Sequence, residues 1–197
     1  MRTFLFLDTV TTGPDTETDR IVQLNTRLAN GRGFYDKNLL AQPANAATIA
    51  YRPADSAPTQ DDHSVSPLLA ALELLLQNAD IIVGHQIDLQ LAFIIAEATR
   101  TGRNGMVATL THPKFGLRGG QRAAICTRRL AADYLRYLGK YSSPADTQLP
   151  GIYRRLFHQR VPDITGAVAC HQLYGFFRDF QLSRKIDFVS DIVCLPD

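Results

Sequence analysis

The first strand-length segment of the chain ends in a single carboxylate, and this feature constrains the fold most. Phe4–Leu7 is uninterrupted apolar sequence, typical of a strand buried on both faces, and we expect a strand over residues 3–8. Asp8 ends this strand, and the segment Thr9–Gly13 follows as a turn. Open α/β sheets bind ligands at the carboxyl ends of buried strands. The segment therefore predicts an α/β protein with a site at Asp8.

The rest of the chain alternates between strand and helix patterns. The helix that follows Gly84 should bury Leu89, Phe93 and Ile94 on its apolar face and end near Gly102. The other expected elements are strands at residues 21–28 and 81–84, one more short strand near 48–51, helices at 66–78, 127–138, 149–158 and 164–178, and long loops within 30–64 and 103–121. This order predicts a mixed sheet with helices on both faces.

Length and composition are those of a soluble globular domain. The 197 residues are 45% hydrophobic and 20% charged. We expect one domain over residues 1–178 and a C-terminal tail over 179–197. No apolar run reaches the roughly 20 residues that span a bilayer, and no secretory signal is expected because Asp8 interrupts the apolar start. Three widely separated cysteines indicate buried thiols in a reducing cytoplasm.

Two segments carry a specific resemblance. Leu7–Gly13 reads Leu-Asp-Thr-Val-Thr-Thr-Gly and resembles the first motif of the DnaQ-like (DEDDh) 3'-5' exonucleases, Leu-Asp-Thr-Glu-Thr-Thr-Gly, with Val10 in place of the glutamate. Ile82–Phe93 resembles the second motif, in which Gln86 replaces an asparagine and Gln90 an aspartate. The resemblance therefore keeps the apolar and glycine framework while it changes the polar positions.

The third motif shows the same pattern. Gly166–Tyr174 resembles its helix, with Gly166 at the aspartate position and Val161 at the histidine position. Cys126-Thr127 stands where the family has an Asp-Thr pair at the start of a helix. The resemblance covers about residues 3–178 and implies an RNase H-like fold.

Enzymes of this class use two divalent metals about 4 Å apart, held by four carboxylates, and a histidine as general base. Two such ions repel by roughly 17 kcal/mol at an effective dielectric of about 20, so several carboxylates are required. Asp8 is the only one of the five functional positions that is retained. The changed positions are Val10, Gln90, Val161 and Gly166. We therefore expect an inactive homologue that needs no cofactor, or Mg²⁺ or Mn²⁺ if it is active.

Other residues are alternatives for the lost groups. The candidates are Asp88, Asp163, His158 and His171. A two-residue step on a helix turns a side chain about 160° away, so Asp88 should not replace Gln90. Asp8 itself could hold one weakly bound Mg²⁺, or could bond the turn amides of Thr11 and Thr12, which is the interpretation we favour. An apolar, dry site is also expected, in which Val10→Glu would destabilise the protein.

Basic residues and tyrosines are concentrated between residues 118 and 160. The basic residues are Arg118, Arg122, Arg128, Arg129, Arg136, Lys140, Arg154, Arg155 and Arg160, and the interleaved tyrosines are Tyr134, Tyr137, Tyr141 and Tyr153. Such a surface can follow a phosphate backbone and stack bases, or can be a solvated helix face whose tyrosines pack inward. The residues expected to contact nucleic acid are Thr9, His85, Gln86, Arg128, Arg129, Arg154 and Arg155.

The sequence thus predicts a degenerate exonuclease homologue that binds single-stranded nucleic acid or acts as a scaffolding subunit of a nucleic-acid-processing complex, for example in DNA replication or repair. One alternative is an active metal-dependent 3'-5' exonuclease with displaced ligands. A second is a purely structural protein-interaction subunit. No membrane association is expected.

Overall fold

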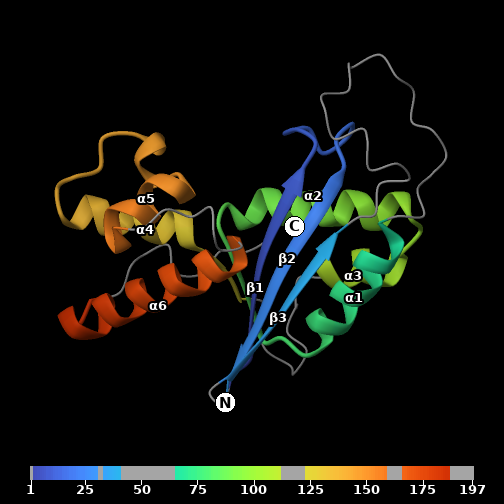
Figure 1. Ribbon diagram of the computed structural model, residues 1–197, viewed down its shortest axis with the longest axis horizontal. Coiled ribbons are helices and arrows are strands. Elements are labelled where there is room, and N and C mark those ends of the chain that lie inside the picture. Colours follow the sequence, from blue (N-terminus) through green and yellow to red (C-terminus); the bar gives the residue numbers. More distant parts are fainter. Residues whose placement is uncertain (1, 31–32, 41–64, 112–122, 159–165, 187–197) are drawn as a thin grey trace.

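A five-stranded mixed sheet forms the centre of the protein (Figure 1). The computed structural model describes residues 2–30, 33–40, 65–111, 123–158 and 166–186. The strands are β1 (Phe4–Thr11), β2 (Ile21–Asn30), β3 (Gly33–Leu40), β4 (Ile81–Gly84) and β5 (Ala123–Cys126), in the spatial order β3-β2-β1-β4-β5. β1, β2 and β3 pair antiparallel, whereas β4 and β5 run parallel to β1.

Helices cover both faces of the sheet (Figure 1). The first face packs against α1 (Ser66–Gln77), α2 (Ile87–Arg100) and α3 (Asn104–Thr111), and the second against α4 (Thr127–Tyr137), α5 (Leu149–Phe157) and α6 (Gly166–Arg184). A short 3-10 helix, η2 (Pro144–Thr147), connects α4 to α5. No helix in the described parts of the chain is both long and apolar enough to cross a bilayer.

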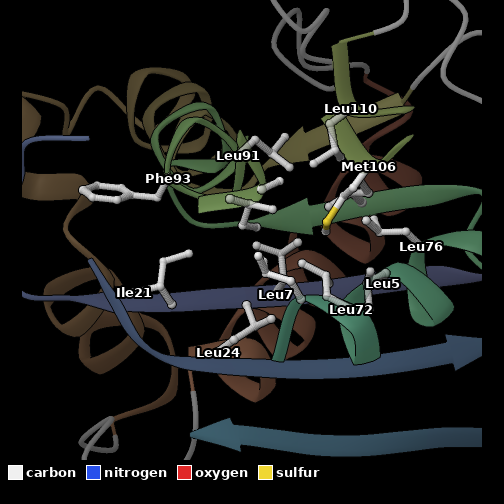
Figure 2. Packing of buried hydrophobic residues seen from close by; sticks show 14 of the residues in the cluster. Leu5, Leu7, Ile21, Leu24, Leu72, Leu76, Leu91, Phe93, Met106 and Leu110 are labelled. Carbon is white, nitrogen blue, oxygen red and sulfur yellow. The ribbon is translucent and has the colours of Figure 1, made fainter. Parts of the chain in front are cut away.

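Two buried clusters sit on opposite faces of the sheet because side chains alternate along β1. Leu5 and Leu7 point into the first cluster, where they meet Leu72 and Leu91, whereas Phe6 points into the second. Figure 2 shows the first cluster, with Met106 and Leu110 of α3 among its side chains. Burying β1 on both faces explains its uninterrupted apolar sequence.

The expected sheet with helices on both faces is confirmed, as are the strands at β1, β2 and β4 and the helices at α1, α2, α4, α5 and α6. Helix α6 continues to Arg184, beyond the expected end at residue 178. The division into a domain over 1–178 and a tail over 179–197 stays a prediction. The strand expected near 48–51 lies outside the described residues.

Two expectations about local structure were wrong, and one strand was missed. Residues 33–40 form β3 and residues 104–111 form α3, where loops were expected, and β5 was not expected at all. β3 has a mixed polar sequence and is defined by its pairing with β2, which composition does not reveal. α3 is a short helix that is held by Met106 and Leu110 in the first cluster. Tertiary contacts thus decide the structure of both segments.

A buried carboxylate on α2 anchors the turn between β1 and β2. Glu97 is 1% exposed, accepts a hydrogen bond from the backbone N–H of Ile21 at 3.1 Å and pairs with Arg20 at 3.3 Å and Arg100 at 3.2 Å. The Arg100 guanidinium also donates to two backbone carbonyls of the turn. Because this turn carries part of the site described below, Glu97 fixes its position.

We expect Glu97→Gln to destabilise the protein by about 2 kcal/mol, because two guanidinium groups and a backbone N–H lose their charged acceptor. Urea denaturation measures the change in the free energy of unfolding. Glu73→Gln is the matched control, since Glu73 forms a more exposed pair with Arg103 and should change stability by less than about 0.5 kcal/mol. Equal effects of the two substitutions would contradict the anchoring role.

Candidate active site of an exonuclease fold

Asp8 lies where β1 passes the carboxyl end of β4. Leu7 is the register partner of Gly84, so Asp8 comes beside His85, and on the other side it faces Asn25 of β2. Asn25 is a buried polar residue of β2 that no sequence motif singles out, because this strand also contains other polar residues. These pairings bring the first and second motifs together, as the resemblance implies.

The Asp8 carboxylate is bonded by amides. Gln90 Nε2 donates to Asp8 Oδ1 at 3.4 Å and to the His85 carbonyl at 2.7 Å, and the Asn25 side chain bonds Asp8 as well. Burial raises the pKa of Asp8 from 3.8 to about 6, and the hydrogen bond from Asn25 opposes this rise. The favoured interpretation of Asp8 as a turn-amide acceptor is therefore wrong.

The turn is held by other carboxylates. Asp19 accepts hydrogen bonds from the Thr12 hydroxyl at 2.8 Å and the Asp15 backbone N–H at 2.9 Å, and Asp15 in turn accepts from the Glu17 backbone N–H at 2.9 Å. Asp8 is thus released from any role in turn formation and faces the site.

Gly166, at the start of α6, lies directly against Asp8. A Cβ atom placed on Gly166 would come within 2.2 Å of Asp8 Cγ and of Oδ2. Carbon atoms in contact are normally about 3.5–4.0 Å apart, so no side chain fits here without displacement of Asp8. The third motif therefore reaches the site, but its carboxylate position is closed. Val161 lies outside the described residues.

Val10 lies on the same face of β1 as Asp8, because the two residues are two positions apart, but it does not fill the site. Its side chain is 41% exposed. The expectation of an apolar, dry site at Val10 is thus wrong. The open carboxyl end of β1, with a register irregularity between Val10 and Thr11, leaves this residue in contact with solvent.

We accordingly expect Val10→Glu to change the free energy of unfolding by less than about 0.5 kcal/mol, since the new carboxylate can remain hydrated. Thermal denaturation at neutral pH tests this expectation, with Leu7→Glu as a buried control on the same strand that should prevent stable folding. A large loss of stability in Val10→Glu would show that the site excludes water.

A neutral histidine lies at the site, and a buried hydroxyl group and a buried thiol lie behind it. His85 Nδ1 lies 3.0 Å from the Thr127 hydroxyl, and that hydroxyl lies 4.0 Å from Cys170 Sγ. Burial lowers the pKa of His85 to about 4, the backbone of Thr147 opposes this change, and the positive charge of Arg128 adds to it. Burial also raises the pKa of the Cys170 thiol, and the negative charge of Asp8 acts in the same direction. At neutral pH, His85 is uncharged and Cys170 is a thiol.

Two neighbouring compartments open at this end of the sheet. The first, of about 380 Å³, is lined by Asp8, Thr9, Thr11, Gly13, Pro14, His85, Gln86, Leu89, Gln90, Phe93, Gln148, Leu149 and Pro150. The second, of about 510 Å³, is lined by Gln86, Asp88, Leu89, Cys126, Arg128, Arg129, Ala132, Arg136, Tyr141, Pro144 and Thr147. We call them the Asp8 compartment and the arginine compartment. They share Gln86 and Leu89.

The two residues that line both compartments, Gln86 and Leu89, are unusual for the start of a helix. Gln86 has a left-handed backbone conformation, with φ 60° and ψ 49°, directly before α2. Leu89 is 42% exposed, so the expectation that it belongs to the buried face of α2 was wrong. Phe93 and Ile94 are buried as expected. Leu89 instead presents an apolar surface to both compartments.

The structure divides the expected nucleic-acid contacts into three groups. Thr9, His85 and Gln86 line the Asp8 compartment, and Arg128 and Arg129 line the arginine compartment. Arg154 and Arg155 are exposed on α5 and line neither compartment. Whether any of these residues contacts nucleic acid stays a prediction.

The alternative catalytic residues lie elsewhere. Asp88 turns away from Gln90 and pairs with Arg129 at 2.6 Å. His171 packs its ring 4.6 Å from that of Phe6, and His158 ends α5. Asp163 lies outside the described residues. None of the three described alternatives lines the Asp8 compartment.

The four tyrosines between residues 118 and 160 differ in burial. Tyr153 is buried and Tyr134 packs against Phe177 and Phe180, as the inward-packing interpretation expects. Tyr137 is exposed, and Tyr141 lies under the guanidinium of Arg136. Only Tyr141 of these four lines a compartment.

Comparison of the whole fold with solved structures finds exonuclease I. The product-bound structure of exonuclease I has a TM-score of 0.58 at 14% identity, over 93% of this chain and 46% of that chain. The zinc-bound E. coli exonuclease I complex with single-stranded DNA has a TM-score of 0.57 at 14% identity, over 94% of this chain and 41% of that chain. The fold is RNase H-like.

A third structure agrees. E. coli exonuclease I with a 5cy-dA13 oligonucleotide has a TM-score of 0.57 at 14% identity, over 93% of this chain and 43% of that chain. The chain therefore spans less than half the length of these exonuclease I chains. No family model matches the sequence, and no curated protein sequence matches it.

The described residues of this RNase H-like site do not fit a pair of divalent metals. Among them, Asp8 is the one carboxylate that lines its compartment, and an amide N–H of Gln90 already points at it. Within the described ranges, no three His, Cys, Asp or Glu side chains are grouped so that they could hold a metal ion. A single carboxylate cannot offset the mutual repulsion of two divalent ions.

Proposed function

We propose that this chain is a catalytically inactive module with an exonuclease fold that binds single-stranded nucleic acid. The observation that carries the inactivity is the position of Gly166 directly against Asp8, because the third motif reaches the site there without a carboxylate. The amide of Gln90 replaces another carboxylate with a hydrogen-bond donor. Two of the carboxylates that would hold metal are thus replaced, one by a neutral amide and one by a residue without a side chain.

Nucleic-acid binding is supported by the shape of the two compartments and the residues that line them. The Asp8 compartment is an open hollow with apolar walls from Leu89 and Phe93 and polar groups from Thr9, His85 and Gln86, a combination suited to a nucleoside. Arginine side chains line the neighbouring compartment, where a phosphate backbone would pass. Two of the exonuclease I structures with this fold hold single-stranded DNA or an oligonucleotide.

The enzymatic part of the proposal is tested with purified protein and a labelled single-stranded DNA or RNA oligonucleotide in Mg²⁺ or Mn²⁺. We expect no release of mononucleotides. Release that depends on metal and disappears in Asp8→Asn would instead establish an active exonuclease with displaced ligands. Release that persists in Asp8→Asn would indicate a contaminating nuclease.

The binding part is tested by titration of the same oligonucleotide at several salt concentrations. We expect measurable affinity at low salt and a steep decline as salt rises, because each neutralised phosphate releases counterions. No binding even at low salt, together with a stable co-purifying protein, would support the scaffolding alternative in place of this proposal.

A further inference from the structure

The residues that line the arginine compartment carry more positive than negative charge. Among the described residues, its lining contains the guanidinium groups of Arg128, Arg129 and Arg136 but only one carboxylate, that of Asp88. Arg129 is neutralised by Asp88 at 2.6 Å, and Arg136 pairs with Asp133 at 2.9 Å. The remaining positive charge belongs to Arg128.

Arg128 is held by neutral acceptors. Its Nε donates to the Thr147 hydroxyl at 3.2 Å and its Nη2 to the Pro144 carbonyl at 3.3 Å. No ion pair within the part of the chain that the structure describes involves Arg128. The side chain is half-buried, so these two bonds orient the guanidinium within the compartment at the cost of some hydration.

The position of Arg128 in α4 favours an anion as well. Arg128 and Arg129 occupy the first turn of this helix, no acidic residue lies in that turn, and the N-cap residue Cys126 gives no side-chain cap. Two cations at the positive end of a helix dipole repel it and each other. A bound anion would offset this repulsion and could accept hydrogen bonds from the uncapped N–H groups. The sequence and the cavity therefore point to the same class of ligand.

The compartment also offers a planar surface beside the charge. The Arg136 guanidinium lies over the Tyr141 ring at 4.6 Å from its centroid. Leu89 and Gln86 connect this compartment to the Asp8 compartment. A ligand with alternating phosphates and bases matches this sequence of groups better than a free anion does.

We propose that the arginine compartment is a phosphate site for single-stranded nucleic acid, with Arg128 as its main contact, and that the neighbouring nucleoside occupies the Asp8 compartment. This rests on the proposed function. The site moves phosphate recognition away from Asp8, where the metals of an active exonuclease would provide it, to guanidinium groups on α4. Nucleic-acid binding thus becomes independent of divalent metal.

The test compares Arg128→Gln with Arg184→Gln by titration of a labelled single-stranded oligonucleotide in EDTA at several salt concentrations. Arg184 is an exposed arginine on α6 that lines neither compartment. Arg128→Gln should weaken binding about tenfold and reduce the slope of log affinity against log salt by about 0.7, the value for one phosphate contact with a single strand. Arg184→Gln should weaken binding less than about twofold.

A substitution that should tighten binding provides a second test, which does not depend on whether Arg128→Gln folds. Asp88→Asn frees Arg129 from its carboxylate and should tighten binding about threefold, whereas Asp179→Asn, which frees Arg178 on α6, should not. Equal effects of Arg128→Gln and Arg184→Gln, or no gain with Asp88→Asn, would overturn the phosphate site while nucleic-acid binding stands. No binding by the wild-type protein would reject the proposed function itself, and a requirement for divalent metal would overturn the inference.

Discussion

Gly166→Ala is expected to destabilise the protein by about 3 kcal/mol, although alanine is the better helix former. The new Cβ would lie within 2.2 Å of Asp8 Cγ, so either α6 or the Asp8 side chain must move. Movement of Asp8 would also break its hydrogen bonds with Gln90 and Asn25. Urea denaturation at neutral pH measures the change in the free energy of unfolding.

Gly175→Ala on the same helix is the matched control. A Cβ on Gly175 meets no atom within 4 Å, so this substitution should stabilise the protein by up to about 1 kcal/mol through helix propensity. In an Asp8→Ala background, the cost of Gly166→Ala should shrink, because the Cγ and Oδ2 atoms that it meets are gone. Equal effects of the two glycine substitutions would show that the third motif does not contact Asp8.

Asp8→Asn is expected to stabilise the protein at neutral pH by about 2–3 kcal/mol. Burial raises the pKa of Asp8 from 3.8 to about 6, so the folded state binds more protons than the unfolded state between these values. The carboxyl group therefore lowers stability progressively as the pH rises from about 4 through about 6, and its full penalty is present above that range. Asparagine removes the charge and still accepts the hydrogen bond from Gln90.

The dependence of this stability gain on pH distinguishes the removal of a buried charge from a nonspecific effect of the substitution. The gain from Asp8→Asn should be large at pH 7.5 and nearly absent at pH 4, as measured by denaturation at both values. Asp179→Asn on the exposed face of α6 should change stability by less than about 0.5 kcal/mol at pH 7.5. If Asp8→Asn destabilises the protein at pH 7.5, Asp8 makes favourable interactions as an anion, for example with a metal ion.

The motif positions could be predicted because the framework residues around them are strongly patterned. The apolar run before Asp8, the Ile-Ile-Val-Gly strand before His85 and the small-residue start of α6 each predict an element and its end. The resemblance then orders these ends around one site, and the structure brings Asp8, Gln90 and Gly166 together. Polar changes at these positions did not obscure the fold, because the apolar core determines it.

The other features of the site depend on contacts between residues far apart in the chain, which the sequence pattern does not reveal. Asn25 is a site residue only because β2 pairs with β1 in the register that places it opposite Asp8. Leu89 fits the apolar stripe of α2, yet the open compartments on either side leave it exposed. Arg128 and Arg155 look alike in sequence, and only the packing of η2 against α4 directs Arg128 into a compartment. These differences arise from tertiary contacts rather than local patterns.

We propose that the site at Asp8 no longer binds the two metals of an active exonuclease. Crystals soaked in Mn²⁺ with a single-stranded oligonucleotide test it directly, because the anomalous scattering of manganese locates each bound ion. We predict nucleic acid in the two compartments, with a phosphate at Arg128 and no pair of ions at Asp8. Two manganese ions bridged by Asp8 and a phosphate oxygen would contradict the account.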